Sequence, residues 1–186
     1  MKGRRRLQIG VMGSAKAICS KKAYKLAVEV GREIAKRRCI LVTGGGGGVM
    51  KAASHGADLE DGIIVGILPG EHKVEANRYV DIAIPTGIGF ARNLMNINSS
   101  HGIIIVEGGG GTMCEVIHAY STNTPAVALV GSGGTADKVA GKTMDQRELE
   151  KIIPVYSPKE AVDTIIKMIR KNKEQLYNPE KHKALL

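Results

Sequence analysis

The feature that most constrains the fold is a repeated alternation of short apolar runs with longer amphipathic stretches. Runs such as Ile63–Leu68 and Ile103–Val106 are rich in β-branched residues and apolar throughout, whereas Lys21–Arg38 places its apolar residues at helical spacing. Strands that are apolar on both faces and alternate with helices are typical of a parallel sheet covered on both sides. We therefore expect a Rossmann-like, doubly wound α/β fold with a mainly parallel sheet.

The pattern predicts one domain over residues 1–174 and a polar C-terminal tail over residues 175–186. The expected strands are Leu7–Met12, Cys39–Thr43, Ile63–Leu68, Val80–Ile84, Ile103–Val106, Ala126–Val130 and Ile152–Tyr156. The expected helices are Lys21–Arg38, Val49–Leu59, Phe90–Ser99, Met113–Tyr120 and Lys159–Lys173.

Half of the 24 glycines lie in three clusters, each directly after an apolar run. The clusters are Gly44–Gly48, Gly108–Gly111 and the glycines of segment 131–134. Flexible linkers are also glycine-rich, but they are polar on both sides. Doubly wound sheets bind ligands at the carboxyl ends of their strands, which is where these clusters are expected. The first two precede expected helices, whose N-termini attract phosphate through free N–H groups.

Two common nucleotide motifs do not account for the clusters. The Gly-x-x-x-x-Gly-Lys-Ser/Thr loop that binds a triphosphate with magnesium is absent from the sequence. Segment 131–136 matches Gly-x-Gly-x-x-Ala, but Gly141 interrupts the helix that a dinucleotide site requires. We therefore expect no nicotinamide site, and the third cluster has no assigned role.

Two charged residues near the second cluster have alternative interpretations. Thr112 and Glu115 fit a capping box, in which Glu115 returns to the backbone of its own helix. The functional alternative places the Glu115 carboxylate beside a phosphate loop, where it positions water or stabilises a sugar cation. Arg92 lies in the first turn of the helix expected over Phe90–Ser99, where the helix dipole disfavours a cation, so a phosphate or a carboxylate is a candidate partner. A surface arginine is the alternative.

Segment 107–115, Glu-Gly-Gly-Gly-Gly-Thr-Met-Cys-Glu, resembles the Pro-Gly-Gly-x-Gly-Thr-x-x-Glu motif of the LOG-like, or "lysine decarboxylase-like", Rossmann proteins. Segment 44–50 is similar to the family's earlier glycine loop, and Gly13-Ser14 is similar to its first-strand turn; the resemblance covers roughly residues 7–170. It implies a catalytic pair, Arg92 and Glu115. It also implies that Gly109, Gly111 and Thr112 hold the phosphate. The glycine loops and the first-strand turn extend the candidate phosphate site to Gly13, Ser14, Gly44, Gly45, Gly46, Gly47, Gly108 and Gly110.

The family includes phosphoribohydrolases, which release a base from a nucleoside 5′-monophosphate. Here Glu107 replaces the motif's Pro, and Asn93 stands where the hydrolases usually have Lys. With these departures the sequence is more similar to a branch of the family that resembles molybdenum-cofactor carrier proteins, which bind a pterin phosphate without turnover. The resemblance therefore leaves two functions open, a phosphoribohydrolase and a non-catalytic carrier or sensor. A lysine decarboxylase is not expected, because no lysine stands out among the loops as a Schiff-base residue.

The distribution of charge and the number of cysteines indicate which binding partners and which cellular compartment to expect. The net charge of +9 lies at the chain ends, and residues 39–157 carry twelve acidic and eight basic residues. No nucleic-acid motif accompanies this charge and no apolar stretch is long enough to span a membrane, so neither partner is expected. Three scattered cysteines favour the cytoplasm over a disulfide or metal site. We expect no required cofactor, a nucleoside monophosphate or similar phosphate ligand and, from the resemblance, a homodimer or higher homo-oligomer.

Overall fold

A computed structural model of the chain describes residues 6–147, 149 and 151–176. Its seven strands form one parallel sheet in the order β4-β3-β2-β1-β5-β6-β7. They are β1 (Gln8–Gly13), β2 (Ile40–Thr43), β3 (Ile64–Leu68), β4 (Ile82–Pro85), β5 (Gly102–Val106), β6 (Ala126–Leu129) and β7 (Ile153–Val155). The Rossmann-like α/β fold expected from the sequence is confirmed.

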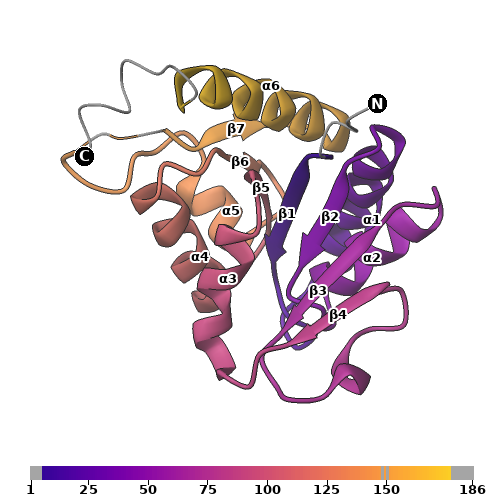
Figure 1. The fold of residues 1–186 in the computed structure, drawn as a ribbon. Coiled ribbons are helices and arrows are strands. Elements are labelled where there is room, and N and C mark those ends of the chain that lie inside the picture. Colours follow the sequence, from indigo (N-terminus) through magenta and orange to yellow (C-terminus); the bar gives the residue numbers. More distant parts are fainter. Residues whose placement is uncertain (1–5, 148, 150, 177–186) are drawn as a thin grey trace.

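Helices cover both faces of the sheet (Figure 1). One face carries α1 (Lys21–Lys36), α2 (Val49–Asp58) and α6 (Pro158–Leu176), and the other carries α3 (Arg92–Asn98), α4 (Gly110–Ser121) and α5 (Gly134–Val139). Two short 3₁₀ turns, η1 (Lys73–Glu75) and η2 (Gly89–Ala91), lie before β4 and α3. Each face buries its own apolar cluster against the central strands, and every residue of β5 is buried. The apolar core therefore lies on both sides of the sheet.

Helices α1 and α2 pack backbone against backbone. A Cβ added to Gly31 would collide with the carbonyl oxygen of Ala53, and a Cβ added to Gly56 would collide with that of Val28. Only glycine permits so close an approach of two helices. Ser20 caps α1, because its Oγ accepts a hydrogen bond from the N–H of Ala23 at 3.1 Å. The cap thereby fixes the start of α1 at Lys21.

Four elements differ from the sequence expectations. The helix expected over Phe90–Ser99 opens with the 3₁₀ turn η2 and becomes α-helical only at Arg92. Helix α4 begins at Gly110, three residues before the expected start, so two glycines of the second cluster belong to it. Helix α5 was not expected at all. Helix α6 continues to Leu176, and residues 177–186 of the expected tail lie outside the described residues.

Of the helices in the described part of the chain, none is long and apolar enough to cross a membrane. The same residues contain no group of three or more His, Cys, Asp or Glu side chains that could hold a metal ion.

Candidate functional site

A cavity of about 160 Å³ opens at the carboxyl ends of β1 and β5. The strand order reverses between these neighbours, because later strands are added beyond β5 on one side and β2 lies on the other. Doubly wound sheets bind their ligands at such a switch point. The cavity is lined by Val11, Met12, Gly13, Ala15, Ile18, Gly44, Met50, Phe90, Arg92, Asn93, Gly109, Gly110, Gly111, Thr112 and Glu115.

The N-terminus of α4 forms one wall of this cavity. Gly109 is its N-cap and has no side chain to cap the helix. The backbone N–H groups of Gly110, Gly111 and Thr112 precede the first intrahelical hydrogen bond, which Met113 N–H donates to the Gly109 carbonyl at 3.0 Å. Their N–H groups and the positive end of the helix dipole favour an anion in the cavity.

Arg92 contributes the one basic side chain among the cavity-lining residues. It is buried, with 7% of its surface exposed, and its Nε has no hydrogen-bond partner. Burial lowers the pKa of the guanidinium, and the nearby Glu115 carboxylate partly opposes this shift. A Cβ at Gly44 would collide with the Arg92 guanidinium, so glycine at position 44 makes room for it.

Glu115 lies on α4 with 6% of its surface exposed. Its Oε1 accepts a hydrogen bond from Nδ2 of Asn96 at 2.7 Å. Burial raises the pKa of Glu115 to about 7, although the Asn96 hydrogen bond and the charge of Arg92 both act in the opposite direction. A carboxyl with this pKa can give or take a proton near neutral pH.

The capping-box interpretation of Thr112 and Glu115 is wrong. Helix α4 starts at Gly110 with Gly109 as its N-cap, so Thr112 lies inside the first turn. The Glu115 carboxylate points to Asn96 of the neighbouring helix α3 and not to the backbone of its own helix. Glu115 is therefore available to the cavity.

Glu107 lies at the end of β5 but does not line the cavity. Its carboxylate oxygens accept hydrogen bonds from the N–H of Ser20 at 3.1 and 3.3 Å. Burial opposes its ionisation, but the hydrogen bonds from Ser14 and Ser20 outweigh burial and hold the pKa of Glu107 below its usual value. The carboxylate thus joins the β5–α4 loop to the start of α1.

The third glycine cluster supports the second one from outside the cavity. The N–H groups of Thr135 and Ala136 donate to the carbonyls of Gly108 and Glu107, each at 2.9 Å. The Asp137 carboxylate accepts from the N–H groups of Gly131 and Gly133 at 2.6 and 3.1 Å. These bonds hold the six-residue helix α5 against the β5–α4 loop.

The expected site residues divide into two groups. One group lines the cavity and consists of Gly13, Gly44, Arg92, Gly109, Gly110, Gly111, Thr112 and Glu115. Outside it are Ser14, Gly45, Gly46, Gly47 and Gly108. Ser14 is buried and its Oγ accepts a hydrogen bond from Gly108 N–H at 2.9 Å. Gly46 and Gly47 line a separate surface hollow with Lys16 and Lys51.

Sequence reasoning missed Asn96, Phe90 and Ile18. Asn96 holds Glu115, while Phe90 and Ile18 line the cavity. A signal for Asn96 existed, because it follows Arg92 by four residues and so shares its face of α3.

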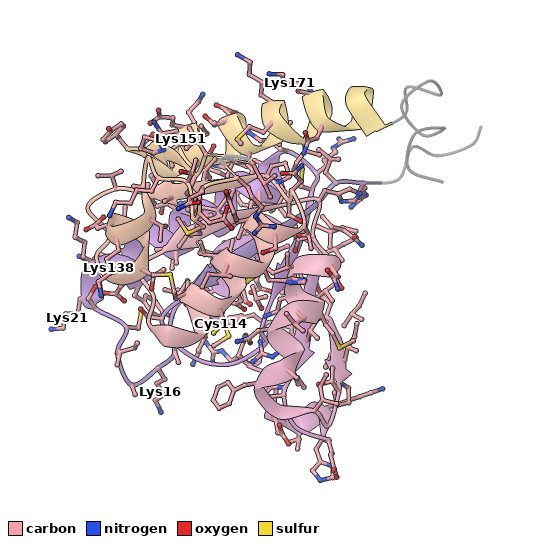
Figure 2. The ribbon with its side chains drawn as sticks, turned by 90° about the vertical axis from the view of Figure 1, so that its left-hand side faces the viewer. Lys16, Lys21, Cys114, Lys138, Lys151 and Lys171 are labelled. Carbon is pink, nitrogen blue, oxygen red and sulfur yellow. The ribbon has the colours of Figure 1, made fainter. Side chains whose placement is uncertain are left out.

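Among the described residues, Arg92 is the one basic residue in the cavity lining. Figure 2 shows Lys21, Lys138, Lys151 and Lys171 pointing outward from the periphery, while Cys114 lies on α4 toward the middle of that view. Within the cavity lining, Arg92 and the backbone N–H groups at the start of α4 are the groups that favour an anion.

The parallel sheet and the glycine-lined cavity at its switch point define a Rossmann-like α/β protein, a class that commonly binds nucleotides. Residues 6–162 match the SLOG cluster 4 family. The chain belongs to this family, which confirms the LOG-like resemblance.

Relatives of known sequence or structure agree with this assignment. An uncharacterized protein of Archaeoglobus fulgidus is 41% identical over 123 residues, which span 66% of this chain and 80% of the relative. The molybdenum cofactor binding protein from Rippkaea orientalis is 32% identical with a TM-score of 0.80, over 90% of this chain and 99% of its own. The molybdenum cofactor carrier protein from Chlamydomonas reinhardtii is 33% identical with a TM-score of 0.77, again over 90% of this chain and 99% of its own.

Proposed function

We propose that the cavity binds a small molecule through a phosphate group and that the protein carries this ligand without converting it. One observation carries the proposal: the free N–H groups at the start of α4 share a cavity with the buried guanidinium of Arg92, whose Nε lacks a partner. A buried arginine with an unpaired donor destabilises the folded protein unless a bound anion accepts a hydrogen bond from that donor. A phosphate monoester supplies both the charge and the acceptor oxygens.

A phosphorylated pterin of the molybdenum-cofactor type is the first candidate ligand. The support comes from the binding and carrier proteins described above, which share the fold over 90% of this chain at 32–33% identity. In this role the ligand is cargo and the protein needs no resident cofactor. Asn93 lines the cavity beside Arg92, where the hydrolases of the wider LOG-like group usually have a lysine.

A second candidate function is the hydrolysis of a nucleoside 5′-monophosphate, and the environment of Glu115 favours it. A buried carboxyl with a pKa of about 7 can position and deprotonate water. In this reaction water adds to C1′ of the ribose, the N-glycosidic bond breaks, and the base leaves with a proton. Arg92 stabilises negative charge on the phosphate or on the leaving base.

One pair of assays separates the two functions. The purified protein is incubated with AMP and other monophosphates, and chromatography detects free base and ribose 5-phosphate. In parallel, molybdenum cofactor is offered to the protein and its transfer to an apo-molybdoenzyme is measured. We expect cofactor protection and transfer without release of base. Release of base that Glu115→Gln abolishes would replace the carrier function by the hydrolase. Failure of every phosphate ligand to bind or to raise the melting temperature would refute both.

We also propose that the chain forms a homodimer in the cytoplasm. Several large apolar side chains on β4, before η2, and on α3 and α4 are exposed: Ile82, Ile84, Ile88, Leu94, Met95 and Ile117. Contact with a second copy would bury such side chains, and the three cysteines are free thiols that suit a reducing compartment. Sedimentation equilibrium tests the dimer, since a chain of 19.8 kDa that sediments as a monomer contradicts it. Fractionation of the source cells tests the location.

A further inference from the structure

Two large apolar side chains at the cavity are exposed to solvent. Phe90 is 84% exposed and Ile18 is 58% exposed, and both line the cavity. Phe90 is the one phenylalanine of the chain, which has no tryptophan. A phenyl ring gains from burial, so a ring left in water at a binding cavity indicates a surface that a ligand covers.

The two side chains are placed next to the polar groups of the cavity. Phe90 lies in the turn η2, two residues before Arg92, which opens α3. Ile18 covers the N-cap of α4, since a Cβ added to Gly109 would lie 2.9 Å from the Ile18 Cδ1 atom. The cavity therefore combines the buried guanidinium of Arg92 and the backbone N–H groups at the start of α4 with large apolar side chains that are exposed.

The size of the cavity limits which part of a ligand it encloses. Its volume of about 160 Å³ is below the roughly 300–1,000 Å³ of complete ligand sites. A ligand held by its phosphate at α4 must then extend outward past Phe90 and Ile18. The part that extends outward meets apolar side chains.

We propose that Phe90 stacks on a flat nitrogen heterocycle of the bound ligand and that Ile18 contacts the same ring. This inference rests on the proposed phosphate site and adds the residues that recognise the ring, so a purine or pterin phosphate should bind in preference to a simple sugar phosphate. Stacking depends on the π-face and tolerates changes in the ring, so it selects the class and not the individual base.

Isothermal titration with AMP, a neopterin monophosphate and ribose 5-phosphate tests the inference on the full chain. We expect Phe90→Ala to weaken binding of the ring-bearing probe roughly 5- to 150-fold, the range for loss of one stacked base, and to leave ribose 5-phosphate unchanged. Phe90→Leu, which keeps apolar bulk without a π-face, should recover only part of the loss. Proton NMR should show upfield shifts of the probe's ring protons that Phe90→Leu removes.

Tyr156→Ala is the matched control, because Tyr156 is an aromatic residue that is 69% exposed and does not line the cavity. Equal affinity for ring-bearing and ring-free probes, with no loss in Phe90→Ala, overturns the stacking inference and leaves the phosphate site standing. A Phe90→Ala chain that sediments as a smaller species with unchanged affinity also overturns it, since Phe90 then belongs to a contact between copies. If no phosphate probe binds at all, the proposed function itself fails.

Discussion

Nδ2 of Asn96 lies 2.7 Å from Oε1 of Glu115, and this hydrogen bond joins helices α3 and α4 beneath the cavity. Both side chains are buried, and Oδ1 of Asn96 has no partner. The amide can donate to an ionised Glu115 through Nδ2, and after rotation it can accept from a protonated one through Oδ1. Asn96 is therefore a positioning residue for either protonation state of the carboxyl.

Replacing Asn96 should destabilise the protein, because Glu115 would lose its one side-chain hydrogen bond while remaining buried. We expect Asn96→Ala to lower the free energy of unfolding in urea by about 1–3 kcal/mol. Asn98→Ala is the control from the same helix, since the Asn98 side chain bonds His118 at the surface, and it should cost less than about 0.5 kcal/mol. Equal effects of the two variants would show that the buried hydrogen bond has no special role.

Glu115 should make the stability of the protein depend on pH. Its pKa is about 7 in the folded chain against 4.5 for an ordinary glutamate, so between these values the unfolded chain releases a proton that the folded chain retains. The free energy of unfolding therefore falls as pH rises from about 4.5 to about 7, by up to about 3 kcal/mol, and changes no further above that range. Below about 4.5 both states hold the proton and the full stability is present.

The measurement compares urea unfolding of the wild type and Glu115→Gln between pH 4 and pH 8. Because the other groups are shared, the difference between the two chains isolates Glu115. We expect the wild type to lose stability relative to the variant as pH rises. Parallel curves would mean that Glu115 ionises normally in the folded protein.

Gly44 should be required for the position of Arg92. A Cβ at position 44 collides with the guanidinium, whereas a Cβ at Gly46 meets only the flexible Cε end of Met50 at 3.1 Å. We expect Gly44→Ala to weaken the binding of ribose 5-phosphate roughly 10- to 100-fold, as for loss of a hydrogen bond to a charged group. Gly46→Ala, in the same loop, should retain binding. Calorimetric titration of ribose 5-phosphate into both variants measures the two affinities. If Gly44→Ala binds as tightly as the wild type, Arg92 does not contact the phosphate.

Proline should not be tolerated at position 107, although the related family motif carries it there. Glu107 has a φ of 53°, and its N–H donates to Ser132 Oγ at 2.8 Å. Proline fixes φ near −65° and has no N–H, so Glu107→Pro should cost at least about 3 kcal/mol of stability. Glu107→Gln keeps the N–H and should cost less. Urea unfolding in which the two variants match would show that this backbone conformation is not needed.

The sequence predicted those parts of the fold that local pattern controls. All seven strands lie within two residues of their expected starts, because runs such as that of β5 are apolar on both faces. Helix α5 escaped prediction because it is stabilised by Asp137, whose carboxylate accepts hydrogen bonds from glycine N–H groups of the preceding loop. The start of α4 was misplaced because glycine has low helix propensity, which the structure overrides at Gly110 and Gly111.

The cavity was predictable only in outline. Glycine clusters at strand ends, with Arg92 and Glu115 close by, indicated where it would form. The role of Glu107 was not predictable, because its partner Ser20 lies 87 positions away in the sequence. Asn96 likewise acquires its role only when α3 packs against α4.

The hydrogen bonds around the β5–α4 loop join three distant parts of the chain. Ser14 binds the N–H of Gly108, and Ser132 binds that of Glu107. The loop can take its shape only after β1, β5 and β6 have docked side by side in the sheet. A chain can therefore bind the ligand only after the sheet has formed. A partly folded chain, or one shortened before β6, would retain the glycine sequence and lose the cavity.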